Sequence, residues 1–176
     1  MKFLIKYNLL FILAFSSLSF QLQQSFDTRA KVKASYIYNF TKHFDWPEKM
    51  KSGSFIIQVI GSNPSLNQEL TKMVSTKQKG NQKLELVISS ALDPSLKPHI
   101  VYLLTESSDL LKDANSKYKG SGTLIITEKA GLAKQGAAIN FVVADNKLAF
   151  EYSENNAKKA GLKTGDGLNS LAIAVD

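Results

Sequence analysis

The residues that could support chemistry in this chain are few, beginning with its two histidines, His43 and His99. His43 lies two positions before Asp45, so the pair could in principle bind a metal ion or move a proton. A zinc site needs three or four ligands, and nothing in the sequence signals the others. The chain has no cysteine, which excludes thiolate ligands, thiol nucleophiles and disulfides. We therefore predict no metal site, with His43 on the flank of a helix and His99 capping a strand or partly exposed.

Two polar residues stand out in an apolar C-terminal segment, Asn140 and Glu151. Asn140 could fix the register of a hairpin or line a pocket, and the structural role is favoured because buried amides are usually paired. Glu151 lies between Phe150 and Tyr152, so strand alternation turns it away from those rings, toward solvent. No second carboxylate is spaced to form a glycosidase pair with it. The motifs of zinc proteases, serine hydrolases and phosphate-binding loops are absent, so we predict no catalytic or cofactor-binding residues and no enzyme activity.

The densest group of aromatic residues is the stretch KASYIYNFTKHFDWP, residues 33–47. Its spacing predicts a helix over residues 28–44, ended by Trp46-Pro47, because the residue before a proline disfavours helical geometry. One stripe of this helix is apolar and should face the core: Ala30, Ala34, Ile37, Phe40 and Phe44. Three residues lie off the stripe and are predicted to be free to contact a partner or a second subunit: Tyr36, Tyr38 and His43.

The elements that must position these residues alternate between strand-like and helical segments. Strands are predicted at 54–61, 83–89, 99–105 and 122–128, and helices at 65–76 and from Ser107 or Ser108 to Tyr118. This alternation indicates right-handed crossovers and a largely parallel sheet. Two β-rich runs then flank Asp145-Asn146, a pair suited to a hairpin turn. We predict a single-domain α/β fold, a mixed and mostly parallel sheet flanked by helices. A C-terminal hairpin and two terminal helices complete it, one at 154–160 and one carrying Leu168, Leu171, Ala172 and Val175.

The beginning of the chain has the pattern of a secretory signal peptide. Lys2 and Lys6 precede an apolar run at residues 9–15, which small residues follow. We predict a signal peptide at 1–22, an exported domain at 23–176 and a periplasmic location, with an uncleaved N-terminal anchor as the alternative.

The charge of the chain argues against nucleic acid as a partner. The formal net charge is +7, but the lysines are scattered along the sequence and Arg29 is the only arginine. A solvated surface explains these lysines most simply. An acidic partner or anionic lipid headgroups are the alternative.

Two stretches of the sequence resemble the YfiR-like family of exported bacterial proteins. KASYIYNFTKHFDWP resembles that family's opening motif, K-A-A-x-x-Y-N-F-x-x-x-x-x-W-P. GAAINFVVADNKLAFEYSENNAKKAGL resembles its closing block, with G-x-x-I-N-F, a hairpin, F-E and A-x-x-A-G-L. The motif positions singled out here, mostly with a core or turn rationale, are Asn39, Phe40, Trp46, Pro47, Gly136, Asn140, Phe141, Glu151 and Gly161.

The resemblance implies a periplasmic α/β domain, dimeric in some members, for which no catalytic residues are established. The named member represses an inner-membrane diguanylate cyclase by contacting its periplasmic domain. We therefore expect a non-enzymatic regulatory module that contacts an inner-membrane signalling protein, and a homodimer as a further expectation. The redox-active disulfides of the repressor branch cannot form here, because the chain has no cysteine. A family resemblance does not transfer the partner.

The alternative function is that of a periplasmic small-ligand-binding protein that feeds a transporter or sensor. Open α/β sheets usually bind ligands at the carboxyl ends of their parallel strands. In this sequence those ends are predicted near Gly61, Glu106 and Glu128.

Overall fold

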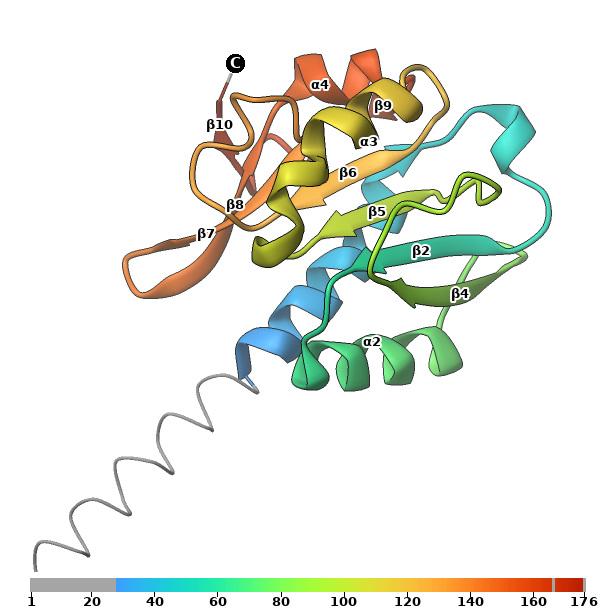
Figure 1. Cartoon of the computed structure of the whole chain (residues 1–176), viewed down its shortest axis with the longest axis horizontal. Helices are drawn as coiled ribbons and strands as arrows, with labels where there is room; N and C mark the ends of the chain where they lie inside the picture. Colours follow the sequence, from blue (N-terminus) through green and yellow to red (C-terminus); the bar gives the residue numbers. More distant parts are fainter. Residues whose placement is uncertain (1–27, 166, 176) are drawn as a thin grey trace, which may run out of the picture.

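The structure is a computed structural model, and it describes residues 28–165 and 167–175. The predicted signal peptide at 1–22 lies outside the described residues. The centre of the fold is an eight-stranded sheet (Figure 1). In spatial order its strands are β10 (Ile173–Ala174), β8 (Lys147–Tyr152), β7 (Ile139–Ala144), β6 (Leu124–Thr127), β5 (Ile100–Leu103), β2 (Phe55–Ile60), β4 (Gln82–Ser89) and β3 (Gln78–Lys79).

Most neighbouring strands run parallel, as predicted. The pairs β4–β2, β2–β5, β5–β6, β6–β7 and β8–β10 are parallel, whereas β7–β8 and β3–β4 are antiparallel. The fold is therefore a mixed α/β domain with a mostly parallel sheet. The predicted hairpin is confirmed, because Asp145 and Asn146 adopt positive φ values of 49° and 59° at its turn.

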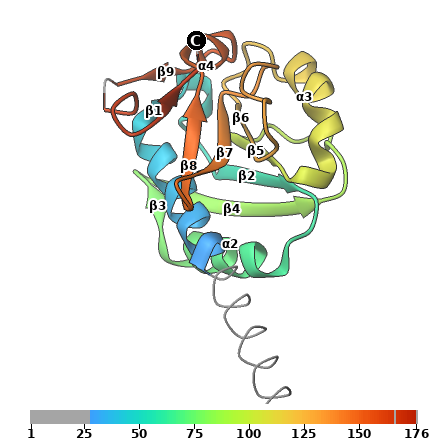
Figure 2. The ribbon, with the colours of Figure 1, turned by 90° about the vertical axis from the view of Figure 1, so that its left-hand side faces the viewer.

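Helices cover both faces of the sheet because successive side chains on a strand point to opposite faces. On β5, Ile100 and Tyr102 pack toward the helix of residues 28–43, here called the aromatic helix, and toward α2 (Pro64–Thr76). Val101 and Leu103 of the same strand pack toward α3 (Leu111–Lys117). Figure 2 shows α3 on the side of the sheet opposite the aromatic helix.

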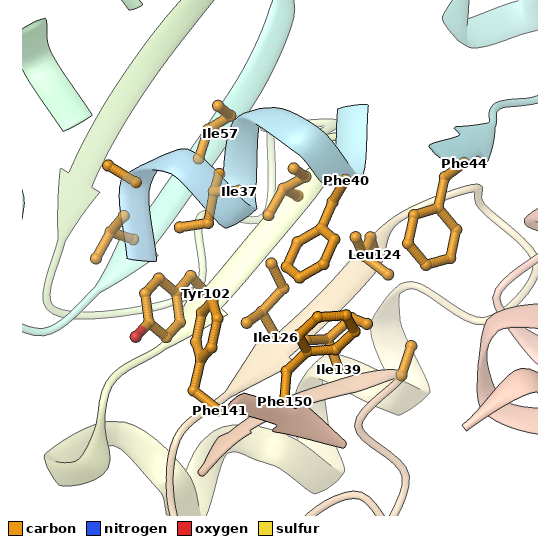
Figure 3. Close-up of a cluster of buried hydrophobic side chains, with 14 of the residues drawn as sticks. Ile37, Phe40, Phe44, Ile57, Tyr102, Leu124, Ile126, Ile139, Phe141 and Phe150 are labelled. Atoms are coloured by element: carbon orange, nitrogen blue, oxygen red, sulfur yellow. The ribbon is translucent and has the colours of Figure 1, made fainter. Parts of the chain in front are cut away.

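The predicted apolar stripe of the aromatic helix is confirmed. All five of its residues are at most 5% exposed: Ala30, Ala34, Ile37, Phe40 and Phe44. Phe40 points from the helix toward Phe141 and Phe150 of the hairpin, with ring centroids 6.1 Å and 5.1 Å away (Figure 3). Each buried ring removes about 150–250 Å² from water, so this cluster fixes the helix against the sheet.

The chain after the aromatic helix turns through two short elements. Strand β1 (Phe44–Asp45) pairs with strand β9 (Lys163–Thr164). Pro47 then precedes the 3-10 helix η1 (Glu48–Met50). Trp46, which lies between β1 and η1 in the sequence, is 2% exposed, and its ring centroid is 4.9 Å from that of Phe55.

The predicted start of the helix after β5 is corrected by the structure. The segment after β5 begins with a 3-10 helix, η2 (Thr105–Leu110), before α3, and no side-chain cap from Ser107 or Ser108 starts either. Ser108 instead donates to the carbonyl of Thr105 at 2.5 Å, three residues back, which suits a 3-10 turn.

Of the two predicted terminal helices, the first forms and the second does not. Helix α4 (Glu154–Lys159) is capped by the side chain of Ser153 and stops before Gly161, whose φ is 85°. The segment that follows contains turns and then strand β10. Leu168 is 1% exposed but Leu171 is 62% exposed, so the apolar residues there do not share one buried face. The backbone N–H of Val175 donates to the carbonyl of Tyr152, which shows that sheet pairing replaces helical hydrogen bonds.

Candidate functional site

The structure separates the three residues predicted to contact a partner. Tyr36 is half-buried, and its ring centroid lies 5.2 Å from that of Phe150 and 6.0 Å from that of Phe141. Its ring therefore forms the margin of the core beside the hairpin. Tyr38 faces α2 instead, and His43 lies beside the C-terminal turn, where a Cβ atom added to Gly167 would be 3.8 Å from its Cε1 atom.

The other histidine, His99, is far more buried than predicted, at 4% exposed. Its Nδ1 atom accepts from the backbone N–H of Ile56 at 3.1 Å, and its Nε2 atom donates to the carbonyl of Met50 at 2.7 Å. Burial lowers the pKa of His99 below its usual 6.5, with a smaller opposing effect from the Met50 carbonyl. The prediction of a capping or partly exposed residue is wrong: His99 ties η1, β2 and the start of β5 together.

A metal centre has no support in the part of the chain that the structure describes. There, no three histidine, aspartate or glutamate side chains gather in an arrangement able to hold a metal ion.

Tyr38 lines a groove between the aromatic helix and α2. The ammonium group of Lys42 lies 4.3 Å from the centroid of its ring, and that of Lys77 lies 5.7 Å away. Cations at such distances are attracted by the face of the ring. We call this hollow of about 360 Å³ the Tyr38 groove; it is lined by Lys31, Ala34, Ser35, Tyr38, Asn39, Glu69, Lys72, Met73, Thr76 and Lys77.

The Tyr38 groove is basic. Lys31, Lys72 and Lys77 line it, against the single carboxylate of Glu69. Within the described residues none of these lysines forms an ion pair. The groove therefore presents a net positive charge beside an aromatic ring.

Asn39 is the residue of the opening motif that the fold does not explain. It is exposed in the Tyr38 groove, and its side chain makes no hydrogen bond to any residue that the structure describes. Its motif neighbour Phe40 is 1% exposed and has a clear core role. An exposed polar residue at a motif position, without a hydrogen-bond partner among the described residues, is a candidate for binding.

The other motif positions are structural. Phe141 is 3% exposed in the aromatic cluster. Gly136 has φ +121°, a backbone conformation that other residues rarely adopt, so glycine is favoured there. Gly161 ends α4 at positive φ, with the carbonyl oxygen of Gly120 3.3 Å from the position of an added Cβ.

Asn140 and Glu151 form a hydrogen-bonded ladder across three strands. Asn140 is fully buried, accepts from the hydroxyl of Thr127 at 2.7 Å and donates to Glu151 at 2.8 Å. These contacts join β6, β7 and β8 at directly paired positions, which is the register-fixing role predicted for Asn140. Glu151 is half-buried and engaged by Asn140, so the expectation that it simply faces solvent is corrected.

The carboxyl ends of the parallel strands, where a ligand was expected, carry a polar network centred on Glu128. Lys33 of the aromatic helix pairs with this carboxylate at 2.5 Å, Tyr102 donates its hydroxyl to it, and the backbone N–H of Thr105 donates at 3.3 Å. Burial acts to raise the pKa of Glu128, but the charge of Lys33 and these hydrogen bonds outweigh it and leave the pKa below its usual 4.5.

The same edge has a shallow hollow of about 540 Å³ around Gly61, Ser62, Ser89 and Glu106. Glu106 is already engaged there by the backbone N–H of Ser62 at 2.9 Å. Glu128 and Glu106, the two carboxylates of this edge, are thus committed to contacts within the protein.

These features define a single-domain α/β protein whose distinctive surface is a basic groove beside an aromatic helix. The chain belongs to the YfiR/HmsC-like family, whose model matches residues 30–173, and this confirms the resemblance of the two motifs. Family membership points to a periplasmic regulatory domain as the broad class. A search of curated proteins finds no match to the chain. Among residues 28–165 and 167–175, no helix has the length and apolar character needed to cross a bilayer.

Sequence reasoning missed the Tyr38 groove, although part of its signal was present. Lys31 and Lys42 lie seven positions before and four positions after Tyr38, so they share its side of a helix. Lys72 and Lys77 belong to α2, and only the packing of α2 beside the aromatic helix brings them to the same groove.

Proposed function

We propose that this domain is exported and acts without catalysis, regulating an inner-membrane signalling protein by binding an acidic segment of its periplasmic domain in the Tyr38 groove. The observation that carries the proposal is Asn39, a family-motif residue that is exposed in this groove and makes no hydrogen bond within the described residues. The family match supports a regulatory role in general terms.

The chemistry of the groove favours an acidic peptide segment. Lys31, Lys72 and Lys77 attract carboxylates, and complementary charge of this kind raises association rates and selects against basic partners. Met73 contributes an apolar contact, and Asn39 offers both a donor and an acceptor to a peptide backbone. A volume of about 360 Å³ suits a few side chains of a partner rather than a whole folded domain.

Site-specific crosslinking tests this proposal. Asn39 is replaced by the photoreactive residue p-benzoylphenylalanine, and the exported protein is irradiated in intact cells. We expect a crosslink to an integral membrane protein, mapped by mass spectrometry to an acidic segment of its periplasmic domain. Lys72→Glu and Lys77→Glu together should lower the yield at least about fivefold, because they reverse the charge of the groove.

The matched control is Lys112, an exposed lysine of α3 on the other face of the sheet. Lys112→Glu should leave the crosslink unchanged, and the photoreactive residue placed at position 112 should not capture the same segment. Crosslinks from position 39 to phospholipid alone, or only to a second copy of this chain, would contradict the proposal. These outcomes would favour a membrane surface or a homodimer, respectively.

A further inference from the structure

A third hollow lies at the amino-terminal edge of the parallel strands, opposite the edge that carries the hollow around Gly61. It has a volume of about 640 Å³ and is formed by η1, the start of β2, the loop before β5 and the end of α3. We call it the amino-edge pocket; its lining includes Lys49, Met50, Ile56, Leu96, Lys97, His99, Lys117 and Tyr118.

Tyr118 has a hydroxyl group with no hydrogen-bond partner among the described residues. The residue is only 4% exposed, yet its oxygen is buried without a contact to a donor or acceptor. Burial, with a smaller effect of Asp93, raises the pKa of Tyr118, so the phenol is neutral and available as a donor. Native proteins pair nearly all buried polar atoms, so a bound water or ligand would supply the acceptor that this hydroxyl lacks.

The other two buried polar side chains of the pocket, His99 and Thr123, are already paired within the protein. Both ring nitrogens of His99 are hydrogen-bonded to backbone atoms of Ile56 and Met50. Thr123 donates to the carbonyl of Pro98 at 2.7 Å. Tyr118 is therefore the buried group in this wall that is left to meet a ligand.

Three lysines surround the pocket: Lys49, Lys97 and Lys117. None forms an ion pair in the part of the chain that is described. Lys117 donates to the carbonyl of Asp93 at 2.5 Å, which holds its ammonium group against the loop before β5. Charged groups thus ring the pocket, while Met50, Ile56 and Leu96 supply apolar surface.

From these observations we infer that the amino-edge pocket binds a small organic anion, an apolar body that carries a carboxylate, sulfonate or phosphate group. Lys97 and Lys117 pair with the anionic group, Tyr118 donates a hydrogen bond to the ligand, and the apolar body rests on Met50, Ile56 and Leu96. This site lies at the other edge of the sheet from the carboxyl ends where α/β sheets usually bind ligands. The inference does not depend on the partner proposed for the Tyr38 groove.

Fluorescence titration tests the inference with a defined probe. The probe is 1-anilinonaphthalene-8-sulfonate, an apolar ring system with one anionic group, and its uncharged counterpart is N-phenyl-1-naphthylamine. We expect saturable binding of one sulfonate probe per chain and at least tenfold weaker binding of the uncharged one. Lys97→Gln and Lys117→Gln should each raise the Kd of the sulfonate probe about fivefold to tenfold, since each removes one ion pair.

Tyr118→Phe gives a readout that a merely structural role would not produce. Because its hydroxyl has no partner in the free protein, removing it should leave the Tm unchanged or slightly higher. The same substitution should raise the Kd of the probe at least about threefold, as a lost hydrogen bond to the ligand would. If the Tyr118→Phe variant does not fold, the Kd of the probe for Lys97→Gln, a change at an exposed residue, still tests the inference.

The control is Lys112→Gln, because Lys112 is an exposed lysine of α3 that does not line the pocket. Equal effects of Lys112→Gln and Lys97→Gln, or a probe affinity unchanged in all pocket variants, would overturn the inference. Equal binding of the charged and uncharged probes would overturn the anionic part of it. The crosslink from position 39 serves as a separate readout, so a failure here is distinguishable from a failure of the proposed regulatory contact.

Discussion

Among the charged residues, loss of the ion pair between Lys33 and Glu128 should lower the stability of the fold most. The two side chains are only 17% and 14% exposed, so removing Lys33 leaves a carboxylate largely buried beside Tyr102. We predict that Lys33→Met lowers the free energy of unfolding by about 3 kcal/mol, the lower end for a broken buried pair because both groups keep some contact with water. Urea denaturation measures this loss.

Two further variants separate the pair from the general effect of removing a lysine. Lys31→Met, on the exposed side of the same helix, should change stability by less than about 0.5 kcal/mol. The double variant Lys33→Met with Glu128→Gln should recover part of the loss, because no buried charge is left unpaired. Equal losses for Lys31→Met and Lys33→Met would refute this account.

Residue types alone revealed only some of the polar side chains that are structural. The sequence favoured a structural role for Asn140, and its buried hydrogen bonds to Thr127 and Glu151 agree. It placed His99 too close to the surface, because the partners of that ring come from η1 and β2, distant in sequence. That the side chain of Asn39 makes no hydrogen bond to residues 28–165 or 167–175 becomes visible only once its neighbours are known.

At the scale of elements, the aromatic helix is held by one stripe, and its two sides should respond differently to truncation. Phe40 is 1% exposed and contacts Phe141 and Phe150, whereas Tyr38 is half-exposed in the groove. We predict that Phe40→Ala lowers the free energy of unfolding by about 3–5 kcal/mol, the cost of a large cavity in an aromatic core. Tyr38→Ala should cost less, about 1–2 kcal/mol, because Tyr38 packs only partly against the core.

Equilibrium denaturation monitored by the fluorescence of Trp46, the chain's only tryptophan, measures both variants. A loss for Tyr38→Ala as large as that for Phe40→Ala would mean that the groove side of the helix also carries the fold. In that case Tyr38 would be a poor candidate for partner binding.

Elements with one strong periodicity were predicted well, and those shaped by long-range pairing were not. The aromatic helix was expected at 28–44 and ends at residue 43, because Phe44 enters the β1–β9 ribbon. The last segment has helical spacing of apolar residues, but Gly165 and Gly167 precede it and β8 offers its open edge. Pairing with β8 therefore competes with a helix that is weak at its start. The Tyr38 groove requires α2 to lie beside the aromatic helix, which periodicity does not encode.

At the scale of the whole molecule, the two proposed sites lie beside different parts of the same sheet. The Tyr38 groove lies between two helices on one face, and the amino-edge pocket lies where α3 ends near the other face. Their lining residues do not overlap. Charge substitutions in one site can therefore be made without altering the contacts of the other.

The stability of the whole domain should fall with acidification in two separate windows. Burial holds the pKa of His99 below its usual 6.5, so the unfolded chain binds more protons than the folded one as the pH falls below about 6.5. Lys33 and its neighbours hold the pKa of Glu128 below 4.5, which produces a second loss below about pH 4.5. In both cases the stabilisation is fully present above the unfolded-state pKa and is lost as the pH drops through the folded-state pKa.

Urea midpoints measured from pH 8 to pH 4 test the upper window, which only histidine side chains should produce. The unaltered domain should show a falling midpoint between pH 7 and pH 5. His99→Gln should start from a lower midpoint, because the contacts with Ile56 and Met50 are weakened, but its midpoint should stay flat over that range. Asn39→Ala, which changes an exposed side chain without an ionisable group, is the control and should keep the slope. A slope that persists in His99→Gln would show that another group controls the acid sensitivity of the fold.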